Sequence, residues 1–490
     1  MTALASSPST TSVEDEFKPT TLVKDKCEDS ANSLDSLNRA EVHGAGSGKT
    51  SRPIVFKEKE FKTRPSVLTT LLDGAAGVVF NLFVAFFVLL TMATMLKDAF
   101  EQRNPLNHFW LILWNFRAFP QTMLVWTLMS ISTIIFPYAA FKMWAHIPAK
   151  TVTARTELPY IVAYVGYLAS MFYFPLKFLF YMNLNPACSF IITCENTRLA
   201  MKVHAFIREN AYRGVQKKLR EEKLKLGETS DWPSVEQFMY YMFCPSLIYR
   251  DSYPRSPTRD WNIVLKYFLQ CLACIYHTNL VFIQFVEPYF SGLDYKQIGW
   301  QDIVYSFFPA ILPGMYCLLM LFYGLLHCWL NMFSEAMQFG DRLFYVNWWH
   351  SKNMAEYYRN WNLVVHEWLY AYIYKDIATL IGGKRGLKVA QTIVFFLSAA
   401  FHEYWFGVSL RIFYPIMFSL YFIFGGIFYS VSRVIRMDYI WNILLFFNLL
   451  IGTGMFIACY SLEWYARQRC GPTLDNAVLD VLVPRHWFCY

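Results

Sequence analysis

Residues 74–98 read GAAGVVFNLFVAFFVLLTMATMLKD, and no charged residue occurs in this run before Lys97. An α-helix rises about 1.5 Å per residue, so a run of this length crosses the roughly 30 Å hydrocarbon core of a membrane. Core helices of soluble proteins have much shorter uninterrupted apolar runs. The stretch therefore predicts a membrane-spanning helix.

Eight further apolar runs follow along the chain. They lie at residues 121–144, 158–183, 186–208, 262–288, 303–334, 387–409, 412–430 and 438–462. We therefore predict an all-α polytopic membrane protein with about nine transmembrane helices. The fourth run contains Glu195 and Arg198, and charged groups at membrane depth normally face protein or a water-filled cavity.

The composition agrees with a chain that lies mostly in a membrane. Of its 490 residues, 55% are hydrophobic and only 16% are charged, whereas soluble proteins are nearer a quarter charged. The formal net charge is +8. Its basic residues gather in loops beside the apolar runs, as cytosolic loops of membrane proteins do, so we expect no nucleic-acid partner.

The basic loops also set the expected orientation, because such loops stay on the cytosolic side. With nine spans the N-terminus is cytosolic, the C-terminus is luminal, and two long loops at residues 209–261 and 335–386 face the cytosol. Residues 1–60 are polar and charged, which predicts a disordered cytosolic tail. The membrane domain then covers residues 61–490 and ends in a luminal tail at about 463–490.

The eleven cysteines do not fall at zinc-ligand spacing, so we expect no metal site. Cys470 and Cys489 lie in the tail expected to be luminal. Because the lumen is oxidising, we predict a disulfide between them. Two free thiols are the alternative.

His402 lies in the apolar run 394–406 and is followed by Glu403. A histidine inside a span costs free energy, and its imidazole accepts a proton near neutral pH. It is therefore a catalytic candidate, although a histidine that only hydrogen-bonds neighbouring helices fits the same pattern. Ser398 precedes it by four residues on the same helical face, where it would act as a nucleophile, a hydrogen-bond partner or a substrate anchor.

Residues 344–362 are too polar to span a membrane and too aromatic for a solvated loop. A surface-lying helix that lines a binding cleft would satisfy both features, and an interfacial aromatic belt is the alternative. Polar and aromatic residues continue at helical spacing, and basic residues follow: Asn362, His366, Trp368, Tyr370 and Tyr374, then Lys375, Lys384, Arg385 and Lys388. These cations would meet the phosphates of an anionic cofactor or serve as ordinary cytosolic charges.

A third polar segment, YRDSYPRSP, occupies residues 249–257. Its two prolines forbid a long helix. The segment predicts a structured cytosolic turn in which Arg250 and Arg255 are available for a carboxylate or a phosphate.

Together these segments resemble the membrane-bound O-acyltransferase superfamily, and in particular its sterol O-acyltransferase branch. The resemblance runs from about Ile54 to the C-terminus. It is carried by MKVHAFIRE (201–209), YRDSYPRSP (249–257), HCWLN (327–331), FGDRLFYVNWW (339–349), YYRNWNLVVHEWLYAYIY (357–374), SAAFHEY (398–404) and EWYARQ (463–468). The YRDSYPR and EWYARQ strings favour the sterol branch over the related diacylglycerol acyltransferases.

The resemblance implies a helical bundle that encloses an intramembrane reaction chamber, and transfer of a long-chain fatty acyl group from acyl-CoA to a sterol hydroxyl. His402 would be the catalytic general base, and Asn362 would hydrogen-bond the thioester carbonyl. A nucleophilic Ser398 is then disfavoured, because no covalent acyl-enzyme is required. Other positions match residues that line the reaction centre or hold acyl-CoA: Trp361 and Ser398, and Tyr357, Tyr358, Arg359, His366, Tyr374 and Lys384.

The sequence departs from the family pattern FYxDWWN at two positions, where Asn347 and His350 replace Asp and Asn. If the acid orients a basic partner or the loop, that pairing is weakened. A different acyl preference or a less active paralogue would follow. His402 and Asn362 are both retained.

Three other interpretations stay open. A diacylglycerol or long-chain alcohol acyltransferase would share the chemistry. A transporter would use Glu195, Arg198, His277 and His402 as relay groups, and a sterol sensor that has lost catalysis would explain the altered motif. The main interpretation expects acyl-CoA as a co-substrate with no permanently bound cofactor, sterol and membrane lipid as partners, homodimers or larger assemblies, and residence in the endoplasmic reticulum membrane.

Overall fold

The computed structural model describes residues 56–74, 76–148, 153–224, 232–432, 434 and 438–489. The chain divides into two units, Met1–Lys57 and Glu58–Tyr490, and almost all the described residues belong to the second. The disordered tail predicted for residues 1–60 lies almost wholly outside the described residues, so it stays a prediction.

The first half of the second unit consists mostly of helices. In chain order they are α2 (Val67–Leu72), α3 (Gly77–Glu101), η1 (Asn107–Phe109), α4 (Trp110–Asn115), α5 (Phe119–Ala145), α6 (Ala154–Tyr181), α7 (Pro186–Leu224), α8 (Val235–Phe243), α9 (Trp261–Val281), η3 (Phe282–Val286), α10 (Glu287–Ser291), α11 (Trp300–Tyr305), α12 (Phe307–Leu321), η4 (Phe322–Trp329) and α13 (Leu330–Ala336). The π-helical turns η3 and η4 continue α9 and α12 without a break.

The second half is helical as well. Its elements are η5 (Trp348–His350), α14 (Met354–Trp361), α15 (Leu363–Leu369), η6 (Tyr370–Tyr374), α16 (Lys375–Ile381), α17 (Gly383–Leu410), α18 (Ile416–Phe418), η7 (Ser419–Phe424), α19 (Gly425–Ser432), α20 (Asp438–Arg469), α21 (Ala477–Leu482) and η8 (Arg485–Trp487). Within the described ranges there is no β-strand, and only two isolated bridges pair Arg64 with Asp341 and Arg255 with Phe339. The predicted all-α class is confirmed.

Seven helical segments of the described chain are long and apolar enough to cross a membrane. They are Gly77–Glu101, Asn107–Ala145, Arg155–Tyr181, Trp261–Ser291, Trp300–Ala336, Gly383–Leu410 and Ile440–Arg469. Each coincides with a predicted run. The predicted run at 412–430 is a shorter apolar helix, Ile416–Ser432, and the run at 186–208 lies in α7. The count of nine spans therefore stays a prediction.

The polar residues of α7 account for its absence from the apolar set. Glu195 accepts hydrogen bonds from Arg198 at 2.8–2.9 Å and from the indole of Trp126 at 2.9 Å. Buried Lys202 donates to the backbone carbonyl oxygens of Tyr241 at 2.5 Å and of Cys244 at 2.8 Å. These charges face protein, as charged groups at membrane depth should.

The helix α7 also runs on to Leu224, so the loop predicted at 209–261 begins as a helix. The prediction ended the helix where apolar residues gave way to charged ones. The long charged side chains beyond that point are good helix formers, and they extend α7 without continuing its apolar character.

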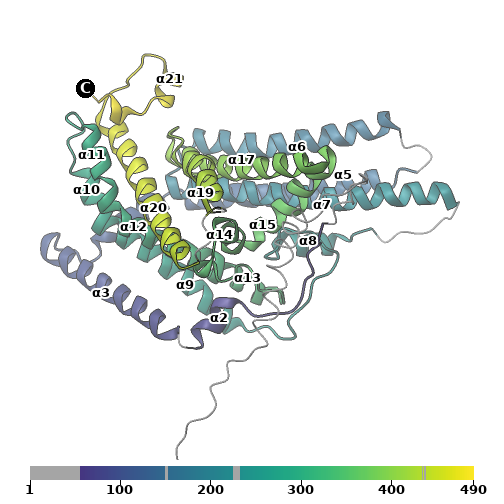
Figure 1. Cartoon of the computed structure of the whole chain (residues 1–490), viewed down its shortest axis with the longest axis horizontal. Coiled ribbons are helices and arrows are strands. Elements are labelled where there is room, and N and C mark those ends of the chain that lie inside the picture. Colours follow the sequence, from purple (N-terminus) through teal and green to yellow (C-terminus); the bar gives the residue numbers. More distant parts are fainter. Residues whose placement is uncertain are drawn as a thin grey trace, which may run out of the picture. The chain divides into compact units, whose positions relative to one another are not determined.

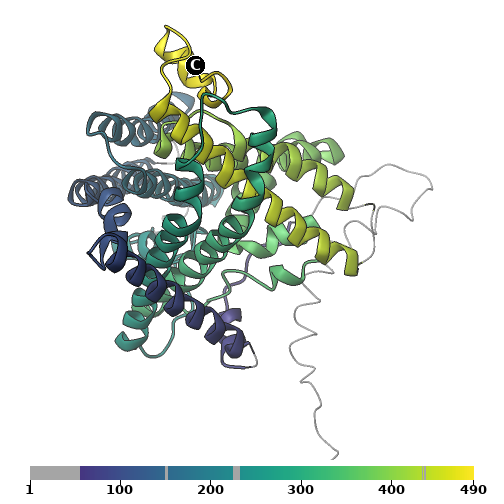
Figure 2. The ribbon, with the colours of Figure 1, turned by 90° about the vertical axis from the view of Figure 1, so that its left-hand side faces the viewer.

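Two groups of long helices make up the unit. Helices α5, α6, α7 and α17 lie side by side, with α7 in contact with each of the other three (Figure 1). In the second group α12 packs along α20 and α9, as the turned view also shows (Figure 2). Many large apolar side chains on α3 are exposed, among them Val78, Leu82 and Leu89, which suits a surface that lipid covers.

The segment between α13 and α17 is folded into the core. Trp348 is only 2% exposed and Tyr345 only 1%, and both belong to one large apolar cluster with residues of α7 and α8. Part of the segment is helical, as α14, and a position along the membrane surface or in an interfacial belt stays a prediction. Tyr345 and Trp348 both pack on Phe322 of η4, which accounts for their burial.

The helix α20 extends past the predicted end of the last span, at residue 462, to Arg469. Glu463 is fully buried, and it forms an ion pair with Arg467 at 2.6 Å and with His486 at 2.7 Å. Because the carboxylate is paired, a charge at this position does not end the helix. The tail predicted from 463 therefore begins in a helix.

Candidate active site

His402 lies in the middle of α17, and one of its ring nitrogens is already engaged. Its Nδ1 atom is 2.7 Å from the backbone carbonyl oxygen of Ser398. Because a carbonyl oxygen only accepts, Nδ1 carries the proton of the neutral ring and Nε2 keeps its lone pair. No described residue hydrogen-bonds Nε2. This nitrogen can take a proton from a bound substrate.

Two aromatic rings cover the imidazole. The Tyr421 ring from η7 stacks on it, with centroids 4.3 Å apart and an angle of 23° between the planes. Trp405, one turn further along α17, approaches with its centroid 4.8 Å away. The indole of Trp405 donates to the Thr197 hydroxyl on α7 at 3.0 Å, so this ring is tied to the neighbouring helix.

The Ser398 hydroxyl does not form a Ser–His pair with His402. The interaction between these residues uses the Ser398 backbone carbonyl, and no hydrogen bond joins the hydroxyl to the ring in the described chain. Side chains one turn apart on a helix run nearly parallel. Of the three sequence-based roles for Ser398, the geometry therefore gives least support to the nucleophile.

Asn362 occupies the junction between α14 and α15. Its side-chain Oδ1 accepts a hydrogen bond from the backbone N–H of Val365 at 3.2 Å and so caps α15. This cap uses only the oxygen of the amide. The Nδ2 group remains a donor that can reach a bound carbonyl. No hydrogen bond among the described residues joins Asn362 to His402.

Trp361 belongs to an aromatic wall beside Asn362. Its ring centroid lies 4.8 Å from that of Trp348 and 5.1 Å from that of Phe322 in η4. Tyr357, one turn earlier on α14, adds a fourth ring at 5.9 Å. The wall joins η4 to the neighbouring elements η5 and α14, and it gives one side of the site an apolar lining.

Tyr357 and Tyr358 link α14 to the helices around His402. Tyr358 packs on Phe395 of α17 at 5.4 Å, and a Cβ atom added at Gly425 would lie only 2.5 Å from its hydroxyl. The glycine thus permits the close approach of α14 to α19. Burial raises the pKa of Tyr357 well above its usual value, and the nearby phenol of Tyr421 raises it further.

Arg359, His366 and Tyr374 lie on the same stretch of chain as Asn362. Burial lowers the pKa of His366 to about 4, with a smaller contribution from the Arg359 guanidinium, so His366 is neutral at pH 7. The ring of Tyr374 stacks on that of Tyr370 at 5.7 Å.

Lys384 is separated from the predicted base by a long distance. It is exposed in the first turn of α17. At 1.5 Å per residue, its backbone lies about 27 Å along the helix axis from that of His402. A single substrate that touches both residues must therefore be long.

The segment at 339–349 is anchored by groups outside the candidate site. Asp341 receives two hydrogen bonds from Arg64, at 2.6 and 3.0 Å. The Tyr345 hydroxyl lies 2.7 Å from Nδ1 of His327 and 3.0 Å from the hydroxyl of Ser66. These contacts fix the chain that leads into η5 and α14.

The turn at 249–257 serves as a structural joint. Arg250 lies 3.7 Å from the carboxylate of Glu209, and the guanidinium of Arg255 lies over the Tyr240 ring at 3.9 Å. Both guanidinium groups thus have a partner inside the protein, but Arg255 is also exposed, so their availability to a ligand stays a prediction. The neighbouring Asp251 is paired in the same way, with Arg213.

Comparison with known proteins decides the family. A model of the membrane-bound O-acyltransferase family, MBOAT, matches residues 123–462. The chain belongs to the membrane-bound O-acyltransferase family. It is 37% identical to sterol O-acyltransferase 1 of Mus musculus over 437 residues, which cover 88% of this chain and 79% of that protein. It is 34% identical to sterol O-acyltransferase 2 of Homo sapiens over 445 residues, which cover 90% and 82%.

Membership makes this chain an acyltransferase, as the sequence predicted. The structure also gives the transporter interpretation no support. Two of its proposed relay groups, Glu195 and Arg198, pair with each other. In a relay, these groups would need to exchange protons or ions with a path across the membrane.

The two departures from the family motif lie at the surface of this acyltransferase. Asn347 and His350 are both exposed at the ends of η5. Trp348, which lies between them, holds the loop by packing on Phe322. Tyr345, which precedes them, holds it by a hydrogen bond with His327. The loop is therefore ordered without an acid at position 347.

Sequence reasoning missed Tyr421, the residue that stacks on His402. An aromatic residue in the apolar run 412–430 has no pattern that separates it from lipid-facing neighbours. His402 was found because polar residues are rare inside an apolar run.

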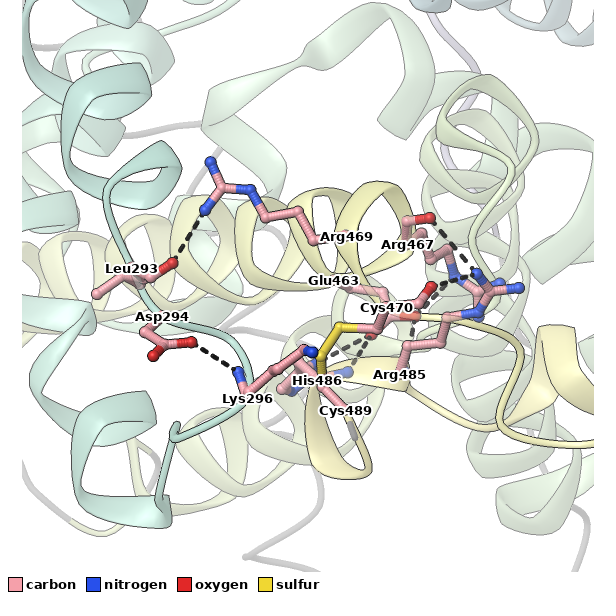
Figure 3. Close-up of a disulfide and its surroundings, with 10 residues drawn as sticks. All are labelled: Leu293, Asp294, Lys296, Glu463, Arg467, Arg469, Cys470, Arg485, His486 and Cys489. Atoms are coloured by element: carbon pink, nitrogen blue, oxygen red, sulfur yellow. Dashed lines mark hydrogen bonds and ion pairs between the residues drawn. A yellow bond between two sulfur atoms is a disulfide. The ribbon is translucent and has the colours of Figure 1, made fainter.

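The C-terminal residues of this acyltransferase form a cap on the end of α20 (Figure 3). Cys470 and Cys489, the predicted pair, are joined by a disulfide with their Cα atoms 5.3 Å apart. Arg485 donates to the backbone carbonyl oxygen of Cys470 at 3.2 Å and to Asp480 at 2.6 Å. The disulfide therefore belongs to a cap that hydrogen bonds also hold.

Proposed function

We propose that this acyltransferase transfers a long-chain fatty acyl group from acyl-CoA to the hydroxyl of a sterol, and so forms a steryl ester. The substrate class is supported by the relatives, which are named sterol O-acyltransferases and match over most of both chains. The mechanism is supported by one observation above all: the bond from Nδ1 of His402 to the Ser398 carbonyl leaves Nε2 as a base.

In the proposed reaction His402 acts first as a base and then as an acid. Its Nε2 atom takes the proton of the sterol hydroxyl while the oxygen attacks the thioester carbonyl carbon. The C–S bond then breaks, and the departing CoA sulfur takes the proton back from the imidazolium. The products are the ester and the CoA thiol, and His402 regains its starting tautomer.

Asn362 is the proposed stabiliser of the oxyanion. Negative charge develops on the thioester oxygen during the attack, and a fixed donor at that point lowers the barrier. Because Oδ1 of Asn362 caps α15, the amide is held with its Nδ2 group turned to the opposite side. The aromatic wall around Trp361 keeps water away from the same region.

The acyl-CoA co-substrate is proposed to enter from the cytosolic side. Its phosphates would lie toward the basic start of α17, near Lys384, and its thioester would reach His402 about 27 Å further along the helix axis. Residues on α14 to η6 would hold the portion between: Tyr357, Tyr358, Arg359, His366 and Tyr374. The sterol would enter from the bilayer, where it is already dissolved.

Residence in the endoplasmic reticulum membrane, with a cytosolic N-terminus and a luminal C-terminus, is part of the proposal. The disulfide at the C-terminal cap supports this orientation, since disulfides persist in the oxidising lumen and seldom in the cytosol. Assembly into homodimers or larger homo-oligomers is proposed from the family resemblance alone.

Competing acceptors test the substrate class. Microsomes that contain the protein, from a host without its own steryl ester and triacylglycerol synthesis, receive labelled oleoyl-CoA and equal amounts of cholesterol, diacylglycerol and a long-chain alcohol. The proposal expects label mainly in steryl ester. Label mainly in triacylglycerol or wax ester would replace the sterol by that acceptor, and no labelled product would favour the sterol sensor.

A further inference from the structure

The proposed mechanism uses neither of the two aromatic rings that contact the imidazole of His402, Trp405 and Tyr421. The Tyr421 ring lies nearly parallel to the imidazole at a centroid distance of 4.3 Å. Tyr421 comes from η7, a separate π-helical element. Turns of π-helix are rare and occur often at functional sites.

The η7 turn is anchored immediately beside His402. Glu403, the next residue on α17, accepts a hydrogen bond from the backbone N–H of Phe418 at 3.2 Å and another from the Tyr460 hydroxyl at 2.9 Å. Phe418 lies three residues before Tyr421. The carboxylate thus ties the start of η7 and a residue of α20 to the helix that carries the base.

Further contacts hold the rest of the turn. Phe422 packs edge-on against Phe396 of α17 at 5.9 Å. At the start of α19, Gly425 lets the Tyr358 hydroxyl approach closely. The element that carries Tyr421 is therefore fixed from α17, α20 and α14, which is what a precise stacking contact requires.

The two contacts of the imidazole restrict different motions. The hydrogen bond from Nδ1 to the Ser398 carbonyl fixes one edge of the ring. The stacked Tyr421 ring fixes the plane of the imidazole, so that together the two contacts set the direction of Nε2. When Nε2 takes a proton, the ring becomes a cation against an aromatic face, which is a favourable arrangement.

We propose that Tyr421 is a positioning residue for the acyl transfer: its ring holds the plane of His402 and stabilises the imidazolium formed when the sterol hydroxyl is deprotonated. The inference rests on the proposed role of His402 as the base. It requires the Tyr421 ring but not the hydroxyl, for which no hydrogen-bond partner is found in the described chain.

The test compares four variants of the full-length protein, purified in detergent and assayed for steryl ester formation at varied oleoyl-CoA. Tyr421→Leu removes the ring, and Tyr421→Phe keeps it. Phe422→Leu is the matched control, because it removes the adjacent ring of η7 that packs on Phe396. His402→Ala tests the base itself.

The proposal expects Tyr421→Leu to lower kcat at least about tenfold, since small misplacements of reacting groups cost that much or more, while KM for oleoyl-CoA stays within about twofold. Tyr421→Phe should recover most of kcat. Phe422→Leu loses one contact of η7 but keeps the Tyr421 ring, so it should lose clearly less kcat than Tyr421→Leu. A merely structural ring would lower activity in both leucine variants alike.

Three results would overturn the inference while leaving the base in place: normal kcat in Tyr421→Leu, an equal loss in Tyr421→Phe, or an equal loss in Phe422→Leu. Retained turnover in His402→Ala would instead remove the base assignment, and the role of Tyr421 with it. The two failures are therefore distinguishable in one set of assays.

Discussion

The proposed mechanism gives Asn362 two tasks, which fall on opposite ends of one amide group. The oxygen caps α15 through the backbone N–H of Val365, and the proposal gives the nitrogen the developing oxyanion. An alanine at this position would remove both at once. A substitution that keeps the capping oxygen and removes the N–H donor is therefore more informative.

Asn362→Asp keeps the acceptor of the cap and removes the donor. We expect kcat to fall about 10²–10³-fold, the usual cost of losing one oxyanion donor, and thermal stability to stay near the wild type. Asn362→Ala should lose a similar factor in kcat and about 1 kcal/mol of stability as well, because the cap is lost. Near-normal turnover of the aspartate variant would remove Asn362 from the chemistry.

His366 predicts a pH dependence of stability. Its pKa is about 4 in the folded chain and about 6.5 when unfolded. Between these values the unfolded state binds the extra proton, so stability falls as the pH drops from about 6.5 toward 4. In detergent, the unfolding midpoint of His366→Gln should fall less steeply over this window than that of the wild type. Equal slopes would contradict the account, and the exposed His350→Gln provides the control.

Individual residues differ in how far the sequence predicts them. His402 stood out because it is a polar residue inside an apolar run, whereas the role of Asn362 came from the family resemblance. The sequence did not show that His402 bonds the Ser398 backbone instead of its hydroxyl, because that depends on a rotamer. The sequence also did not show that Arg250 pairs with Glu209 or that Arg255 lies over Tyr240, because those partners lie elsewhere in the sequence.

Helix ends were harder to predict than helix positions. Both α7 and α20 continue past the residue where charged side chains begin. In α20 the reason is a buried acid that finds its partners in three dimensions, Arg467 and His486. A pattern along the chain records the charge at Glu463 but not the pairing.

Glu463 tests this account of α20. Its replacement by Ala leaves Arg467 and His486 without their partner in a buried setting, so the variant should lose about 3–5 kcal/mol of stability. Glu463→Gln should lose less, since it still accepts hydrogen bonds. Thermal unfolding in detergent measures both, with the exposed Asp475→Ala as the surface control. An unchanged midpoint for Glu463→Ala would refute the pairing.

The cap disulfide predicts a labelling pattern. In sealed, unreduced microsomes opened by mild detergent, Cys470 and Cys489 should resist an alkylating reagent until a reductant is added. A Cys470→Ser variant should then expose Cys489 to the reagent without reduction. Ready labelling of both residues in the unreduced wild type would argue for two free thiols.

At the scale of the whole molecule, hydropathy predicted the location of seven long helices, because a long apolar run in a membrane protein usually forms a membrane-spanning helix. It failed for the centre of the fold. The chain between α13 and α17 is polar enough to look like a loop, yet its aromatic residues Trp348, Tyr357 and Trp361 pack together. Such packing depends on contacts between distant segments, which periodicity does not record.

This arrangement also places the two proposed catalytic residues on different parts of the fold. His402 belongs to the long helix α17, and Asn362 to the buried segment that precedes it. A rigid span thus holds the base, and a core segment held by aromatic packing holds the donor. The central claim is that the chain so built transfers an acyl group to a sterol through His402.

One measurement tests that claim most directly. Microsomes from a host that lacks sterol esterification, with wild type or His402→Ala at matched expression, receive labelled oleoyl-CoA and cholesterol. The account predicts steryl ester from the wild type and none above background from a variant that remains folded. Steryl ester from both proteins at similar rates would contradict His402 as the base, and none from either would contradict the sterol reaction itself.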